Sequence, residues 1–244
     1  MTETSEGDHE NMNHSNVPTS GRSNRSDTGG VTHLWFLLDR SGSMASIRHD
    51  VVSGFDAFFA TQAQNPGNTV VSLVQFDSGN PYEKLFHRLP IARVRSIGRR
   101  FSPRGTTPLF DAIGMLLDDA ERGAGDIDRL VVILTDGHEN ASVRWSREVL
   151  FERISRLRRA GWTFVFLGAN QDAYATGRGL GFADGSVTNF SGDGAGARSV
   201  CGSLGRATSE WRNKPREVRH RDEGRFFGSC KEAEIEMASR HERR

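Results

Sequence analysis

The chain of 244 residues contains 36% hydrophobic and 26% charged residues, and its formal net charge at pH 7 is +1. This composition excludes a collagen-like, fully disordered or membrane-embedded chain. The small net charge gives no overall field that would recruit nucleic acid or acidic lipid. The longest apolar runs, residues 34–38 and 130–134, are far shorter than the ~18 residues that a membrane-spanning helix needs.

Both ends of the chain are polar. Residues 1–30 are rich in Ser, Asn, Thr, Gly and Asp, so we expect a disordered N-terminal tail. Residues 213–244 carry charges of both signs and are expected to form a charged tail or a surface helix, which leaves 31–212 as the folded domain. The N-terminus lacks the basic start and apolar stretch of a secretory signal, and Cys201 and Cys230 are expected to be free thiols in a reducing compartment. These features predict a cytoplasmic protein.

Between the two ends, short apolar runs alternate with amphipathic segments. The runs predict buried strands at 31–38, 69–76, 129–135 and 162–168, with a further strand at 82–89 and an edge strand near 187–190. Helical spacing predicts helices at 47–63, 109–117, 146–160, 173–180 and 197–211, and a glycine-rich loop at 191–196. This order predicts a doubly wound α/β fold with a mostly parallel central sheet and helices on both faces.

Oxygen-bearing side chains follow the predicted strands at three places. Asp39, Ser41 and Ser43 come after the first strand, Thr107 precedes the second helix, and Asp136 ends the third buried strand. Ligands of open α/β sheets bind beyond the carboxyl ends of the strands, and Mg²⁺ or Mn²⁺ prefers oxygen ligands. Two carboxylates balance the charge of a dication. If they act mainly through bound water, the three hydroxyls make the direct contacts and the cation stays electrophilic toward an acidic side chain of a partner.

The same residues resemble a known family. The stretch Asp39-x-Ser41-x-Ser43, the Gly-Thr-Thr-Pro-Leu loop with Thr107, and Asp136 in Thr-Asp-Gly are similar to the von Willebrand factor A domain and its metal-ion-dependent adhesion site (MIDAS). The resemblance covers roughly residues 31–190 and is greatest to stand-alone bacterial and phage members. It implies that the two serines and the threonine contact the metal, while the two aspartates do so directly or through water. Thr107 aligns with the motif, but Thr106 stands where Gly is frequent, so either threonine remains a candidate.

The resemblance implies a metal-dependent protein-binding module rather than an enzyme. Its Mg²⁺ or Mn²⁺ would be completed by an Asp or Glu carboxylate of a protein partner, such as an ATPase or another effector encoded separately, with no nucleic acid or membrane involved. The alternative is a metal-dependent hydrolase or phosphotransferase with Asp39 as nucleophile. That chemistry needs a second positioned carboxylate, and position 41 holds Ser.

Other polar residues near the motifs have plainer interpretations. Arg40 is expected to be exposed and could steer an acidic ligand. Asp111 is expected on a helix in a solvent-facing or supporting role, and His138 and Glu139 are expected to be solvated loop residues. Residues 170–172 either line the rim of the binding surface or cap the following helix. Asp39, Ser41 and Ser43 could themselves form only a turn and a helix cap.

Overall fold

The core of the structure is a six-stranded sheet with the strand order β3-β2-β1-β4-β5-β6. The computed structural model describes residues 30–228 except 66, 124, 126, 170, 171 and 223. Strands β1, β2, β4, β5 and β6 are parallel, and only β3 is antiparallel to its neighbour β2. The predicted doubly wound α/β fold with a mostly parallel sheet is therefore confirmed.

The elements follow one another as the sequence pattern predicts. The strands are β1 (Val31–Asp39), β2 (Thr69–Asp77), β3 (Asn80–Pro90), β4 (Ile127–Thr135), β5 (Thr163–Ala169) and β6 (Val187–Phe190). The helices are α1 (Arg48–Gln64), α2 (Leu109–Glu121), α3 (Arg147–Arg159), α4 (Ala173–Gly179), α5 (Gly194–Asn213) and α6 (Arg216–Arg221), with a 3-10 helix at Gly42–Ile47 between β1 and α1.

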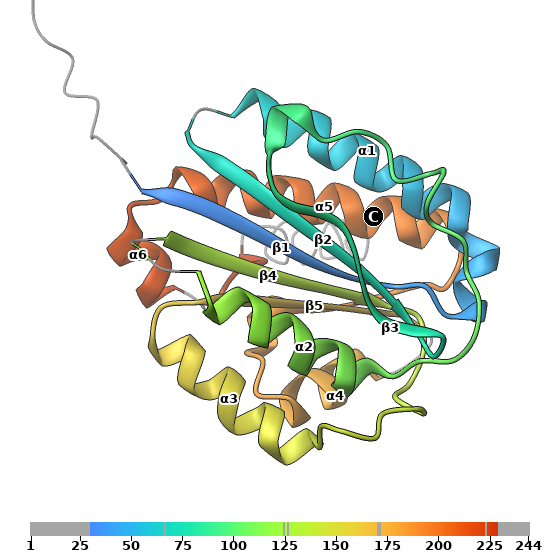
Figure 1. The fold of residues 1–244 in the computed structure, drawn as a ribbon. Coiled ribbons are helices and arrows are strands. Elements are labelled where there is room, and N and C mark those ends of the chain that lie inside the picture. Colours follow the sequence, from blue (N-terminus) through green and yellow to red (C-terminus); the bar gives the residue numbers. More distant parts are fainter. Residues whose placement is uncertain are drawn as a thin grey trace, which may run out of the picture.

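The central strand β1 divides the interior into two apolar layers, because successive side chains of a strand point to opposite faces. Leu34, Phe36 and Leu38 pack in the layer under α1 and α5. Trp35 and Leu37 pack in the layer under α2, α3 and α4. Figure 1 shows α1 and α5 on one side of the sheet and α2, α3 and α4 on the other. The carboxyl ends of β1 and β4 lie side by side, which fixes where their following loops begin.

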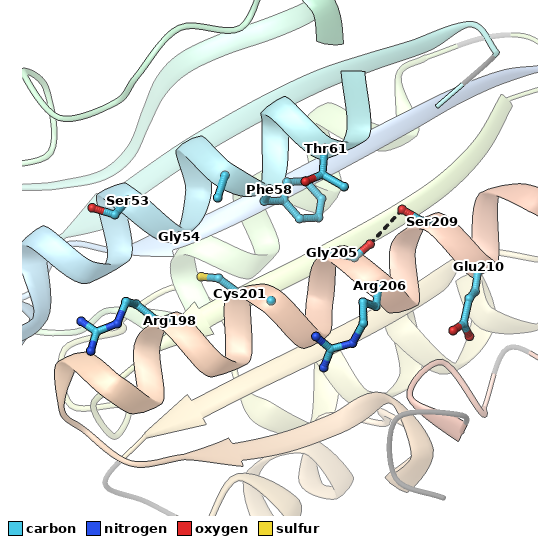
Figure 2. A pocket seen from close by; sticks show the side chains of 12 residues that line it. Ser53, Gly54, Phe58, Thr61, Arg198, Cys201, Gly205, Arg206, Ser209 and Glu210 are labelled. Atoms are coloured by element: carbon cyan, nitrogen blue, oxygen red, sulfur yellow. Dashed lines mark hydrogen bonds between the residues drawn. The ribbon is translucent and has the colours of Figure 1, made fainter. Parts of the chain in front are cut away.

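Helices α1 and α5 lie against each other over one face of the sheet (Figure 1). Gly54 permits the close approach, since a Cβ atom there would lie 2.6 Å from the Sγ of Cys201. A groove of about 520 Å³ runs along the outer side of this contact, and Gly54 and Cys201 are among its lining residues. Figure 2 shows Phe58 of α1 and Cys201 of α5 in its wall, with Arg198 and Arg206 along its α5 side.

Helix α5 begins earlier than predicted. The loop prediction for 191–196 is wrong for its last three residues, because Asp193 caps a helix that starts at Gly194. The Asp193 carboxylate accepts the backbone N–H of Gly196 at 2.7 Å, and this bond offsets the low helix propensity of the glycines.

After α5 the chain continues into a short helix rather than leaving the folded body. Arg219 of α6 is buried, and its guanidinium pairs with Asp128 at 2.9 Å and lies over the ring of Trp211. Phe226 and Phe227 are also buried in the layer under α5. A helix is present at 216–221, within the range that the sequence predicts to be a charged tail or a surface helix.

Some predictions concern residues that the structure does not describe. Residues 1–29 of the predicted disordered tail at 1–30, together with Cys230 and the last residues of the chain, lie outside the described part. Cys201 is a buried free thiol. In the part of the chain that the structure describes, no helix is long and apolar enough to cross a bilayer.

Candidate metal centre

Asp39 lies at the carboxyl end of β1 and joins two strand ends. Its side chain is fully buried. One carboxylate oxygen accepts the backbone N–H of Ser41 at 2.7 Å, and the other accepts the Oγ1 hydroxyl of Thr135, at the end of β4, at 2.6 Å. Both oxygens therefore have a donor from the protein, and the loop that follows β1 is held close to the loop that follows β4.

A chain of hydroxyl and carboxylate groups crosses between these two loops. The Oγ atoms of Ser41 and Ser43 are 3.1 Å apart. The Ser43 hydroxyl donates to Oδ1 of Asp136 at 2.7 Å. Residues separated by 93 positions in the sequence are thus in direct contact, and three oxygen-bearing side chains lie side by side at one edge of the sheet.

Thr107 reaches the same place from the loop before α2. Its backbone N–H donates to Oδ1 of Asn140 at 2.9 Å, and its carbonyl accepts the N–H of Asn140 at 3.2 Å. A Cβ atom built on Gly137 would lie 3.2 Å from Oγ1 of Thr107 and 3.9 Å from Oγ of Ser43. Both hydroxyls therefore lie beside Gly137. Thr107 is buried, whereas Thr106 is exposed, which places Thr107 rather than its neighbour among the other four residues.

The two aspartates lie where a negative charge is costly without a compensating cation. Burial raises the pKa of Asp39 to about 6, although the hydrogen bonds from Thr135 and Ser41 oppose the shift. Burial also raises the pKa of Asp136, and the hydrogen bond from Ser43 opposes it. A cation nearby favours the charged form of a carboxylate, so this pair of side chains is suited to a positively charged ligand.

The donor set is one of hard oxygen atoms. Ser41, Ser43 and Thr107 offer neutral hydroxyls, and Asp39 and Asp136 offer carboxylates, which is the chemistry that Mg²⁺ and Mn²⁺ prefer. Within residues 30–228 as described, no three His, Cys, Asp or Glu side chains cluster in a way that could hold a metal.

Two carboxylates outside the proposed ligand set, those of Asp111 and Glu139, hold the loop after β4. Asp111, near the start of α2, is buried and accepts the backbone N–H groups of Val143, Arg144 and Trp145 at 2.8–3.0 Å. The expectation of a solvent-facing Asp111 is wrong, because the buried carboxylate holds the backbone of residues 143–145.

Glu139 has the same function closer to Asp136. Its carboxylate accepts the N–H groups of Phe110, Ala141 and Ser142 at 2.7–2.8 Å and the Ser142 hydroxyl at 2.6 Å. The interpretation of Glu139 as a solvated loop residue is wrong, because the residue ties its own loop to the N-terminus of α2. His138 is exposed, as expected.

Arg40 is buried, contrary to prediction. Its guanidinium pairs with Asp77, at the end of β2, and with Glu83 of β3 at 2.6 Å. Arg104, from the loop that leads to Thr107, also contacts Asp77, at 3.1 Å. Asp77 is completely buried, so two arginines compensate it, and the loop after β1 is fixed to the neighbouring strands. Arg40 therefore does not face an incoming ligand.

The loop after β5 contributes a helix cap. Oδ1 of Asp172 accepts the N–H of Ala175 at 2.9 Å and so caps α4. Of the two predictions for residues 170–172, the structure supports a helix cap for Asp172 rather than a place on the rim of the binding surface. Asn170 and Gln171 lie outside the described residues.

Comparisons with solved structures agree with this architecture. The pilus adhesin SpaC from Lactobacillus rhamnosus GG is 13% identical, with a TM-score of 0.59 over 74% of this chain and 31% of that chain. Proximal thread matrix protein 1 from the mussel byssus, in a form with a zinc-occupied MIDAS motif, is 16% identical, with a TM-score of 0.52 over 74% of this chain and 46% of that chain. Manganese-loaded TRAP protein of Plasmodium vivax is 15% identical, with a TM-score of 0.51 over 70% of this chain and 72% of that chain.

The chain thus spans less than half the length of the mussel protein and about a third of the pilus adhesin. No curated protein sequence matches it significantly. A family model gives the more specific result, since residues 33–192 match the von Willebrand factor type A domain. This match covers most of the chain and includes every strand that positions the candidate metal centre. The chain therefore belongs to the von Willebrand factor type A domain family.

Proposed function

We propose that this protein is a metal-dependent protein-interaction module with a MIDAS formed by Asp39, Ser41, Ser43, Thr107 and Asp136. The cation is Mg²⁺ or Mn²⁺, and an Asp or Glu carboxylate of a partner protein completes its coordination. The hydrogen bond between Ser43 and Asp136 carries the proposal, because it joins the loop after β1 to the loop after β4 through two candidate ligands. Thr107 beside Gly137 adds the third loop.

The charge of the site favours an acidic partner. Two aspartates formally neutralise a dication, and the remaining candidate ligands are uncharged hydroxyls, so the cation keeps its affinity for another anionic oxygen. The domain family supports the same function, since metal-occupied forms of two members of this fold, with zinc in the mussel protein and manganese in TRAP, have been solved. The partner is a separate protein such as an ATPase or another effector, and a cytoplasmic location is proposed with it.

The alternative of an Asp39-dependent hydrolase or phosphotransferase receives less support. A nucleophilic carboxylate must reach the substrate, but Asp39 is completely buried and both of its oxygens accept hydrogen bonds from Ser41 and Thr135. The buried Arg40 is paired with two carboxylates, so it does not offer a free cation for a phosphoryl group. We therefore propose that the protein is not an enzyme.

Titration calorimetry with MgCl₂ and MnCl₂ tests the metal site directly. Ser43→Ala and Thr107→Ala each remove one hydroxyl ligand, and we expect affinity to fall by about tenfold or more. Thr106→Ala and Ser53→Ala are matched controls, because Thr106 is exposed in the same loop and Ser53, on α1, donates its hydroxyl to the backbone carbonyl of His49. No heat of binding in the folded wild-type protein, or equal loss in controls and ligand variants, would contradict the proposal.

Partner binding is tested by affinity capture with the wild-type protein, in Mg²⁺ and in EDTA. A partner that depends on the MIDAS is retained in Mg²⁺, released in EDTA, and missing from a Ser43→Ala capture. After the captured protein is identified, replacement of its acidic contact residue by the amide should abolish binding. A partner that binds equally well in EDTA and to Ser43→Ala shows that the cation is not the binding element.

A further inference from the structure

A second polar site lies at the other end of β1. A cavity of about 290 Å³ opens between the C-terminal end of α2 and strands β1 and β3. Its polar lining consists of His33, Trp35, His87, Arg88, Asp119 and Arg122. His33 is close to the start of β1, whereas Asp39 is its last residue, so this cavity and the metal centre are separated by the length of the strand.

An irregularity in β3 creates one wall of the cavity. The pairing of β2 with β3 passes from Val71 opposite Leu89 to Leu73 opposite Phe86, with a register shift between them. His87 and Arg88 therefore both stand opposite Ser72, as in a β-bulge. Arg88 has a φ of +48°, an unusual conformation for a residue with a side chain. In a regular strand two successive residues face opposite sides, but here both line the same cavity.

The Ser72 hydroxyl holds this irregular geometry. It is completely buried, accepts the backbone N–H of Arg88 at 3.0 Å, and lies 2.9 Å from Nε2 of His33 and 3.5 Å from Nδ1 of His87. The ring of Trp35 lies next to both histidines, with centroids 4.5 Å from His33 and 6.0 Å from His87. The wall is therefore fixed by specific contacts.

Unused hydrogen-bond donors surround the cavity. Trp35 is 2% exposed, and its buried Nε1 has no hydrogen-bond partner within the described residues. Arg88 and Arg122 line the same space, and neither forms an ion pair with any residue that the structure describes.

The balance of charge in the cavity is positive. Asp119 is the acidic residue of its lining, but one of its oxygens already accepts from the Tyr82 hydroxyl at 2.8 Å and from Nζ of Lys84 at 3.1 Å. The pKa of His33 is lowered to about 3, first by burial and then by the charges of Arg88, His87 and Arg129. The excess positive charge of the arginines is therefore available to an anion.

We propose that this cavity binds a small organic oxyanion, a molecule with a phosphate or carboxylate group that pairs with Arg88 and Arg122 beside the indole of Trp35. The volume of about 290 Å³ is at the lower end of small-molecule sites. Phosphate and carboxylate share the planar, bidentate pairing that arginine provides. The ligand would contact β1, β3 and α2 without contacting the metal centre.

NMR of the full chain provides a site-specific test, because each of the four tryptophans gives one indole N–H signal. The Trp35 signal is assigned by its loss in Trp35→Phe. Inorganic phosphate and citrate are titrated separately, with potassium chloride at matched ionic strength as the salt control. We expect the Trp35 signal to shift saturably with at least one of the two anions, and the responding anion identifies the preferred head group.

Substitutions then test the arginines. Arg88→Gln and Arg122→Gln should each weaken binding by about tenfold, equivalent to about 1.4 kcal/mol, whereas Arg95→Gln, an exposed arginine elsewhere, should not. An unchanged thermal midpoint shows that the variants remain folded. The proposal is overturned if neither anion moves the Trp35 signal at tens of millimolar, if chloride reproduces the shift, or if Arg95→Gln weakens binding as much as the other two.

Discussion

Replacing Asp111 should destabilise the protein, although this residue lies outside the proposed ligand set. Asp111→Ala removes the acceptor of three backbone N–H groups, those of Val143, Arg144 and Trp145. Asp111→Asn keeps one acceptor oxygen, which can hold the two N–H groups now bound to Oδ1 and lose only that of Val143. The two variants therefore remove different numbers of hydrogen bonds from one buried position.

The magnitude follows from those bonds. A hydrogen bond to a charged group contributes about 1.5–3 kcal/mol, but Val143 and Arg144 are exposed, so water replaces part of what is lost. At roughly 1 kcal/mol for each bond, Asp111→Ala should lower the free energy of unfolding by about 3 kcal/mol and Asp111→Asn, which loses one bond, by about 1 kcal/mol. Glu139 still holds the neighbouring part of the loop. The loss of unfolding free energy is therefore smaller than it would be if the whole loop after β4 were detached.

Urea unfolding followed by circular dichroism measures the difference. Asp118→Ala is the matched control on the same helix, because Asp118 is partly exposed and pairs only with Arg153 at 2.8 Å, a contact worth less than about 1 kcal/mol. If Asp111→Ala costs no more than Asp118→Ala, or if the alanine and asparagine variants are equally stable, the three N–H bonds do not support the loop as described.

Three further predictions concern packing, titration and the buried arginine. Gly54→Ala should cost about 1–3 kcal/mol in chemical unfolding, because its Cβ would lie 2.6 Å from the Sγ of Cys201; Gly202→Ala, which meets only a flexible side-chain end at 3.8 Å, should be neutral or stabilising. The pKa of His33 is near 3 when folded and about 6.5 when unfolded. The unfolded state therefore binds the extra proton between these values, and stability should fall by up to about 1.4 kcal/mol per pH unit as pH drops below 6.5, a slope that His33→Gln should flatten in melts across pH 4–7. Arg40→Met should lower the free energy of unfolding by about 3–5 kcal/mol in the same melts, because the fully buried carboxylate of Asp77 keeps only Arg104 of its two arginine partners among the described residues. A loss below 1 kcal/mol would show that the ion pair between Arg40 and Asp77 is dispensable.

The strands and the proposed ligands were predictable from local pattern. Val31–Asp39 is a continuous apolar run, which indicates a strand buried on both faces. Because parallel strands end at a common edge, the position of Asp39 and Asp136 directly after two such runs already predicts that they lie close together. The neighbouring hydroxyls of Ser41 and Ser43 follow from the same argument.

The supporting residues were not predictable in the same way. Asp111, Glu139 and Arg40 act through bonds to backbone or to residues more than 25 positions away, and a charged residue in a loop has the same local pattern whether its partner is water or protein. One signal was available for Arg40, since Asp77 ends a strand next to β1 and a buried carboxylate requires a cation. The bulge at Arg88 left no trace in the spacing of apolar residues, because it depends on Ser72 of another strand.

The contact of α1 with α5 buries Cys201, so the reactivity of this thiol indicates whether the two helices are in contact. Burial raises the pKa of the Cys201 thiol to about 12. Because alkylating reagents react with the thiolate, Cys201 should react slowly while α5 is packed against α1. Local opening that separates α5 from α1 would be detected as alkylation of Cys201 in a chain whose other cysteine has been replaced. The rate of that labelling measures how often this part of the molecule opens.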